Sequence, residues 1–137
     1  MTIRRLPTVR ECMDTSVPTL SPETDIFKGV TFLLQKRVTG APVTGPNGEL
    51  LGMLTEFDCL KILTHGNANH EPPKGQVKDF MTSVVQTVPP DMDIYYVAGL
   101  FMKVHFRRFP VVEDGRLVGA ITRFDILRAV QHGLVAR

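Results

Sequence analysis

The sequence predicts an α/β (α+β) fold made of two pseudo-symmetric β-α-β-β-α units that pack sheet to sheet. Two observations predict it. The chain matches itself at a shift of 68 residues, which brings 9–13 onto 77–81, and each repeat alternates short apolar runs with segments of helical periodicity. A unit of about 55–60 residues buries too little surface to be stable alone. We therefore expect the two units to bury their apolar faces on each other.

The repeat sets the expected boundaries. The shift becomes 67 after one residue is lost in a turn, so that 52–58 falls on 119–125. The first unit with its lead-in is predicted at 1–66 and the second at 77–137. They are joined by a linker at 67–76, which carries asparagine, glycine and two prolines.

Each unit is expected to begin with a short apolar strand, at 17–20 and 84–88, that leads into a proline-containing turn. A helix follows, because apolar residues recur at helical spacing over 26–34 and 94–102. One face of each helix is therefore predicted to be buried. Asp91 and Asp93 are expected to act as capping acids at the start of the second of these helices, favoured there by the helix dipole.

A β-hairpin and a shorter helix complete each unit. Apolar runs on either side of an Asn-Gly and an Asp-Gly turn predict hairpins at 41–54 and 109–121. The shorter helices are predicted at 56–63 and 123–130. Each follows its hairpin directly, so a strand is expected to lead straight into a helix.

The composition excludes several classes of protein. The chain has 137 residues, of which 43% are hydrophobic and 22% charged, values close to the average of globular proteins and unlike disordered chains or coiled coils. The net charge of +2 is too small to indicate nucleic-acid binding. No apolar run approaches the ~18 residues that span a bilayer, and the N-terminus lacks the apolar core of a signal peptide. We therefore expect no membrane partner and a cytoplasmic location.

Neither a metal site nor a disulfide is expected. Cys12 and Cys59 lack CxxC spacing and are interpreted as small buried hydrophobic residues. The histidines are scattered: His65 and His70 flank a loop, and no pair has helical spacing. The sequence also lacks a nucleophile, HExxH or Walker motif, so we predict no catalytic residues and no enzyme.

The sharpest repeated element is Gly-x-x-Thr-x-x-Asp, at 52–58 and 119–125, where a strand is expected to meet a helix. One interpretation is a capping box, with Thr as the N-cap and Asp three residues later. The other is a ligand site. The helix N-terminus and the Thr hydroxyl would bind a phosphate, the Asp would accept hydrogen bonds from ribose hydroxyls, and the glycine would let a ligand approach the strand.

A second element distinguishes the two repeats. Arg107 and Arg108 precede the middle strand of the second unit, whereas Thr39 and Gly40 occupy the matching positions of the first. Two adjacent arginines suit a phosphate, although cations are also favoured at the end of a helix. Spacing supports both interpretations about equally.

The doubled order of these motifs over 9–130 resembles a tandem pair of CBS (cystathionine β-synthase) domains, also called a Bateman module. The resemblance implies a regulatory module that binds AMP, ADP, ATP or S-adenosylmethionine in clefts between its two domains. It implies no required cofactor, and it implies frequent dimerisation.

By that resemblance, each cleft combines residues of both repeats. One cleft is expected to contain Thr122, Asp125, Ala120, Arg107, Arg108, Pro18, Val38 and Thr39. The other is expected to contain Met53, Thr55, Asp58, Gln86 and Phe106. Both keep the Asp of the motif, so ribose binding is expected in both, whereas the arginine pair is present in one.

Two functions follow from the resemblance. In the first, the chain is a stand-alone adenine-nucleotide sensor that signals to a separate, unidentified effector protein, through a ligand that binds two poses with different affinity. In the second, the clefts are vestigial and the chain is a dimeric interaction module. Nucleic-acid binding ranks below both, because the sequence has no stripe of alternating aromatic and basic residues. The sequence leaves open which adenosine ligand binds and whether one or both clefts hold it.

Overall fold

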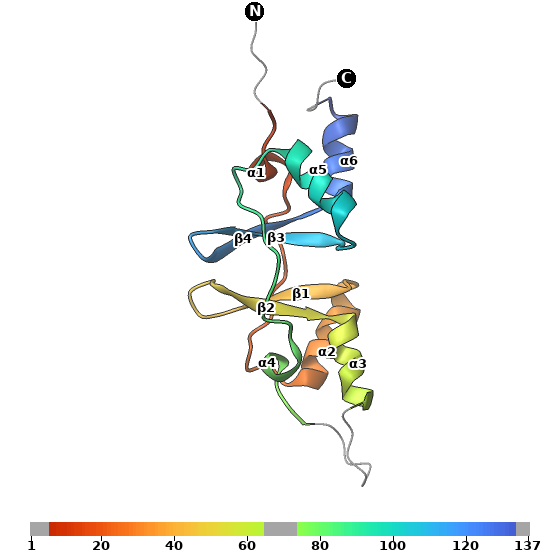
Figure 1. Cartoon of the computed structure of the whole chain (residues 1–137). Coiled ribbons are helices and arrows are strands. Elements are labelled where there is room, and N and C mark those ends of the chain that lie inside the picture. The colour runs from red at the N-terminus through yellow and green to blue at the C-terminus, as the bar shows by residue number, and fades with distance from the viewer. Residues whose placement is uncertain (1–5, 65–73, 134–137) are drawn as a thin grey trace, which may run out of the picture. The chain divides into compact units, whose positions relative to one another are not determined.

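The structure, a computed structural model, describes residues 6–64 and 74–133 (Figure 1). The chain divides into two compact units, Pro18–Val85 and a second made of Met1–Val17 with Gln86–Arg137. The described part of each unit contains a two-stranded antiparallel sheet covered by helices, which confirms the predicted fold class. Most of the predicted linker 67–76 lies outside the described residues, as do His65 and His70.

The unit Pro18–Val85 contains a hairpin, two helices and a single helical turn. These are α2 (Ile26–Lys36), β1 (Gly40–Thr44), β2 (Leu50–Thr55), α3 (Glu56–Thr64) and α4 (Val77–Phe80). The helices and the hairpin contribute jointly to one core. Its buried members are Leu20, Ile26, Leu33, Ala41, Val43, Leu54, Ile62 and Val77.

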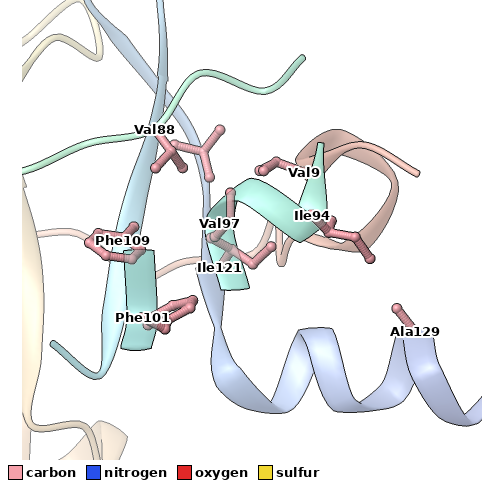
Figure 2. Packing of buried hydrophobic residues seen from close by; sticks show 9 residues of the cluster. Val9, Val88, Ile94, Val97, Phe101, Phe109, Ile121 and Ala129 are labelled. Atoms are coloured by element: carbon pink, nitrogen blue, oxygen red, sulfur yellow. The ribbon is translucent and has the colours of Figure 1, made fainter. Parts of the chain in front are cut away.

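The other unit repeats this arrangement. It contains α1 (Val9–Cys12), α5 (Ile94–Lys103), β3 (Arg108–Glu113), β4 (Arg116–Thr122) and α6 (Arg123–Gln131). In its core the ring of Phe101 packs on that of Phe109, with centroids 4.5 Å apart (Figure 2). Figure 2 also shows Val97 and Ile121 close to this pair and Val9 beside Ile94.

The predicted helices and hairpins are confirmed, with ends that differ by one or two residues. The capping role of Asp93 is confirmed as well, because its side chain accepts a hydrogen bond of 2.9 Å from the backbone N of Tyr96. Asp25 caps α2 in the same way, accepting from the backbone N of Phe27 at 3.0 Å. Both caps satisfy amide groups that the first turn of a helix leaves without a partner. Asp91 lies two residues before the N-cap of α5 and pairs with Arg10 at 3.8 Å, so its predicted capping role is wrong.

The predicted strands at 17–20 and 84–88 are wrong. Each is reduced to an isolated parallel bridge, of Leu20 with Val43 and of Val88 with Val111. Prolines lie on either side of Leu20 and directly after Val88, and proline has no backbone N–H to extend a ladder. A single residue of each apolar run therefore pairs with the hairpin.

The boundaries predicted from the repeat, 1–66 and 77–137, do not coincide with the compact units. Each repeat begins with a short segment, its lead-in, at 9–14 in the first repeat and at 77–82 in the second. Val9 of the first lead-in is fully buried in the core around β3 and β4, which belong to the second repeat. Val77 of the second lead-in is fully buried in the core around β1 and β2. Each lead-in thus packs with the hairpin of the other repeat. This contact is distant in the sequence, so the pattern within one repeat does not reveal it.

Backbone hydrogen bonds fix each lead-in beside the second strand of its hairpin. Asp14 and Ala120 of β4 exchange two N–H···O bonds of 2.9 and 3.0 Å. Thr82 and Met53 of β2 exchange two bonds of 2.9 Å each. The lead-in therefore lies directly against the strand that carries the repeated motif.

These bridges explain the glycines of the motif. A Cβ at Gly119 would lie 2.7 Å from the carbonyl O of Asp14 and 2.8 Å from Sδ of Met13. A Cβ at Gly52 would lie 2.6 Å from the carbonyl O of Thr82. The space beside each glycine is therefore filled by the lead-in of the chain itself. The expectation that the glycine leaves room for a ligand to approach the strand is wrong.

Gly119→Ala should lower the free energy of unfolding by about 1–3 kcal/mol, because overpacking must displace the Asp14 backbone. Gly99→Ala is the matched control. Gly99 lies inside α5 and a Cβ there meets nothing within 4 Å. Alanine is favoured over glycine in a helix by about 0.8–1.0 kcal/mol, so this variant should gain stability. Urea unfolding measures both, and equal effects of the two substitutions would contradict the close approach.

Candidate ligand-binding site

The two Thr–Asp motifs lie where a strand meets a helix, as predicted. β2 leads directly into α3 and β4 into α6 (Figure 1). Thr55 ends β2 and Asp58 lies in the first turn of α3, while Thr122 ends β4 and Asp125 lies in the first turn of α6. The Asp side chains are buried, since Asp58 is 2% and Asp125 5% exposed. A buried carboxylate needs hydrogen-bond donors, so its partners define what the site can do.

Asp125 and Thr122 form a reciprocal capping box. Oδ2 of Asp125 accepts from the backbone N of Thr122 at 2.7 Å and from its hydroxyl at 3.0 Å. Oγ1 of Thr122 accepts in turn from the backbone N of Asp125 at 3.3 Å. Oδ1 of Asp125 accepts from the guanidinium of Arg128. The capping interpretation is therefore confirmed, and it uses the carboxylate that the ligand interpretation assigns to ribose.

Asp58 has the same cap and one additional partner. Its Oδ2 accepts from the backbone N and the hydroxyl of Thr55, both at 3.0 Å. Its Oδ1 accepts from Nζ of Lys61 at 3.2 Å and from the hydroxyl of Thr82 at 3.1 Å. The four bonds satisfy this carboxylate fully.

Three side chains that bind these carboxylates were not predicted from the sequence. Lys61 and Arg128 each follow the motif Asp by three residues, a spacing that places them on the same helix face and that could have been found. Thr82 lies 24 residues from Asp58 on another segment. No local signal connects the two.

Strand register places Arg108 beside the motif of the second repeat. Arg108 of β3 is the cross-strand partner of Thr122, and Gly40 of β1 is the partner of Thr55. Cross-strand partners project their side chains from the same face. The half-buried Arg108 thus adds a cation to one motif, while the other motif has no side chain at that position.

Arg107 and Phe106 lie in the connection between α5 and β3, where both are exposed. Phe106 makes an edge-to-face contact with Phe109, with ring centroids 6.0 Å apart. Within the described part of the chain, neither Arg107 nor Arg108 takes part in an ion pair. Arg108, opposite Thr122, is therefore available for an anion, and Arg107 is an exposed cation next to it in the sequence.

The other predicted residues are distributed over the two units. Ala120 and Met53 are buried in β4 and β2, where their backbone groups bond to the lead-ins. Pro18, Val38 and Thr39 are half-buried residues of the unit Pro18–Val85, and Gln86 is an exposed residue of the other unit. The structure thus brings together, within each unit, the motif residues and the position that faces the motif Thr.

Burial raises the pKa of both cysteine thiols. For Cys59 the Asp58 carboxylate raises it further, and for Cys12 the carboxylates of Glu11 and Asp125 do so. Both thiols are free and half-buried.

Among residues 6–64 and 74–133 no group of three or more His, Cys, Asp or Glu side chains is arranged to hold a metal ion. In the same residues no helix is long and apolar enough to cross a membrane.

A surface groove of about 440 Å³ lies in the unit Pro18–Val85, away from the motif residues. It runs between the segment around Leu20 and one face of α2. Its lining residues are Thr19, Leu20, Ser21, Thr24, Lys28, Thr31, Phe32 and Gln35. None of them is a predicted site residue.

The chain belongs to the CBS domain family, whose model matches residues 9–65 and 77–132. A relative, MJ1225 of Methanocaldococcus jannaschii, is 34% identical over 120 residues. The match covers 88% of this chain and 41% of MJ1225, so the chain spans less than half the length of that relative.

Solved structures of CBS pairs share the fold. CBSX2 of Arabidopsis thaliana in complex with AMP is 30% identical, with a TM-score of 0.78 over 91% of this chain and 96% of that chain. The CBS domain pair of MJ0100, in complex with 5′-methylthioadenosine and S-adenosyl-L-methionine, is 26% identical, with a TM-score of 0.74 over 93% and 98%.

Alkylation of Cys59 by iodoacetamide should report the charge of Asp58. The thiolate is the reactive form, so a raised pKa should make the reaction slower than for an exposed cysteine and shift its rise to higher pH. In a Cys12→Ala background, Asp58→Asn should lower the pKa and speed the reaction at pH 8. Cys12 in a Cys59→Ala background is the control, and its alkylation rate should not change with Asp58→Asn. Equal Cys59 rates with and without Asp58→Asn would contradict the electrostatic cause.

Proposed function

We propose that this chain is a regulatory CBS pair that binds an adenosine-containing ligand, AMP, ADP, ATP or S-adenosylmethionine, at its Thr–Asp motifs. The observation that carries the proposal is Arg108 opposite Thr122, which adds a cation to a helix N-terminus that already holds a hydroxyl and a carboxylate. The complexes of CBSX2 with AMP and of MJ0100 with 5′-methylthioadenosine and S-adenosyl-L-methionine support adenosine as the shared part of the ligand.

The chemistry of a nucleotide matches the motif of the second repeat. Free N–H groups at the start of α6 and the guanidinium of Arg108 favour a phosphate. Within the described residues, Oδ1 of Asp125 accepts a single hydrogen bond, from Arg128. That oxygen can therefore accept another from a ribose hydroxyl.

The remaining contributions are proposed from the family resemblance alone. In the cleft of Asp125 they come from Ala120, Arg107, Pro18, Val38 and Thr39. In the cleft of Asp58 they come from Met53, Thr55, Gln86 and Phe106. Arg107 would face the phosphates together with Arg108, the Thr55 hydroxyl would lie at the start of α3, and the other residues would line the clefts around the adenosine.

The proposed role is regulation of a separate effector protein, with no catalysis by this chain. Ligand binding would stabilise one conformation of the module relative to another, and this would alter the surface to which a partner protein binds. The alternative, an interaction module with vestigial clefts, is favoured by one observation: the caps already use Oδ2 of both motif carboxylates. Titration with nucleotides separates the two functions.

Asp125→Ala should weaken binding of both AMP and adenosine, because the ribose contact is common to them. Arg108→Ala should weaken AMP by about tenfold or more and leave adenosine nearly unchanged, since a hydrogen bond to a charged group contributes roughly 1.5–3 kcal/mol. Arg108→Ala should also reduce the salt dependence of AMP binding. Calorimetric titration measures all of these affinities.

Asp58→Ala is the matched control for Asp125→Ala, because it removes the same cap from the other repeat. It should spare the tighter AMP site. If it abolishes that site while Asp125→Ala leaves it intact, the clefts are assigned the wrong way round. If AMP, ADP, ATP and S-adenosylmethionine all fail to bind the unmodified chain, the interaction module replaces the sensor.

We also propose that the chain forms a homodimer. Of the apolar pairs on the long helices, Leu33 and Phe101 are buried, but Leu34 and Met102 are 73% and 86% exposed. The shorter helices expose further apolar side chains, namely Phe57, Leu60 and Leu63 on α3 and Phe124, Leu127 and Val130 on α6. Equivalent apolar faces on both units suit a symmetric interface between two copies.

Light scattering at micromolar concentration should give twice the chain mass of 15.3 kDa. Phe57→Asp and Phe124→Asp, which charge the exposed faces of α3 and α6, should shift the protein toward monomer. Val84→Asp places the same charge on a residue that is 93% exposed and outside both helices, so it should leave the dimer intact. A mass of one chain for the unmodified protein would refute the dimer.

A further inference from the structure

Asp58 is the more fully occupied of the two motif carboxylates. Two bonds from Thr55 and one each from Lys61 and Thr82 fill the four acceptor positions of its side chain. Asp125 accepts three hydrogen bonds within the described part of the chain. One acceptor position is therefore left at Asp125 and none at Asp58.

The difference arises from one position of the lead-ins. Thr82 and Asp14 are equivalent in the repeat, and both form the same antiparallel backbone bridge with the second strand of a hairpin. The Thr82 hydroxyl donates to Asp58. An ionised Asp14 is an acceptor only, and it accepts from the backbone N of Ser16 at 2.9 Å. Among residues 6–64 and 74–133, the donors to the Asp125 carboxylate are Thr122 and Arg128, and no side chain of the first lead-in is one of them.

We propose that Thr82 is a positioning residue that closes the Asp58 motif to ribose hydroxyls, so that an adenosine ligand occupies the Asp125 motif first. This inference rests on the proposed function. Ribose hydroxyls bind a carboxylate by donating to it, and Asp58 can accept only if Thr82 or Lys61 gives up its bond. The Asp125 motif can thus accept a hydrogen bond from a ribose hydroxyl as it stands, whereas the Asp58 motif is closed to one.

Of the two donors, Thr82 is the harder to displace. The Lys61 side chain is long and 39% exposed, and its Nζ also donates to the carbonyl O of Phe80 at 3.4 Å, so it can leave Oδ1 of Asp58 and keep another partner. Thr82 is itself an exposed residue, so the difference lies in its backbone, which is held by two hydrogen bonds to Met53. Only rotation about χ1 can withdraw its hydroxyl, and χ1 of a β-branched residue is restricted.

The test isolates the Asp58 motif in an Asp125→Ala background and measures the adenosine Kd by calorimetry. Thr82→Val keeps the side-chain shape and the strand preference but removes the donor. It should tighten adenosine binding by about tenfold or more, the effect of one hydrogen bond to a charged group. Thr82→Ser restores the hydroxyl and should bind like the background. Ser83→Ala, at the exposed neighbouring position, should change nothing.

The reciprocal variant adds the donor to the other motif. In an Asp58→Ala background, Asp14→Thr places a hydroxyl at the position equivalent to Thr82. It should weaken adenosine binding at Asp125 by about tenfold or more. Asp14→Val removes the carboxylate without adding a donor and is the control, which should not weaken it to the same extent.

The outcomes separate this inference from the proposed function. If the Asp125→Ala background binds adenosine and Thr82→Val leaves that binding unchanged or weaker, the closing role of Thr82 is overturned and the proposed function stands. If neither the unmodified chain nor any variant binds adenosine or AMP, the proposed function fails and this inference fails with it. Thermal unfolding checks each variant, and if Thr82→Val does not fold, the Asp14→Thr result decides.

Discussion

The close approach of each lead-in to the second strand of a hairpin is the constraint on which the rest of the structure depends. The carbonyl oxygens of Asp14 and Thr82 occupy the space that a Cβ of Gly119 or Gly52 would need. The approach buries a lead-in valine in each core and also brings Thr82 within hydrogen-bond distance of Asp58. Folding and the proposed ligand site therefore share the same few atoms.

This sharing makes the motif carboxylates serve two purposes. A buried Asp is costly unless donors surround it, and the cap supplies an N–H, a hydroxyl and a cation to Asp125. A ligand hydroxyl must either use a remaining acceptor position or replace one of these donors. Its affinity is then the net result of the new hydrogen bond and the rearranged cap. The stabilising and binding roles are alternatives only where every acceptor position is filled, as at Asp58.

The sequence predicts those parts of the fold that have a local signal. Helical periodicity predicts α2 and α5, the Asn-Gly and Asp-Gly turns predict both hairpins, and the Thr–Asp spacing predicts the caps. The strand at 17–20 fails because the prolines around Leu20 prevent a ladder from extending beyond one bridge. The partner of each lead-in, and the bond from Thr82 to Asp58, could not be predicted. Both depend on packing between segments that are distant in the sequence, and such packing leaves no periodic pattern of residues within either segment.

The two repeats are alike where the fold requires particular residues and different where it does not. Replacing Gly119 would displace the lead-in, and removing Thr122 or Asp125 would leave groups at the start of α6 unsatisfied. Asp14 is exposed and Arg108 half-buried, so neither is required by the core, and substitutions at such positions usually cost little stability. These are the positions at which the repeats differ in charge and in hydrogen-bond donors. A duplicated scaffold can thus keep one geometry twice and still offer a ligand two chemically different motifs.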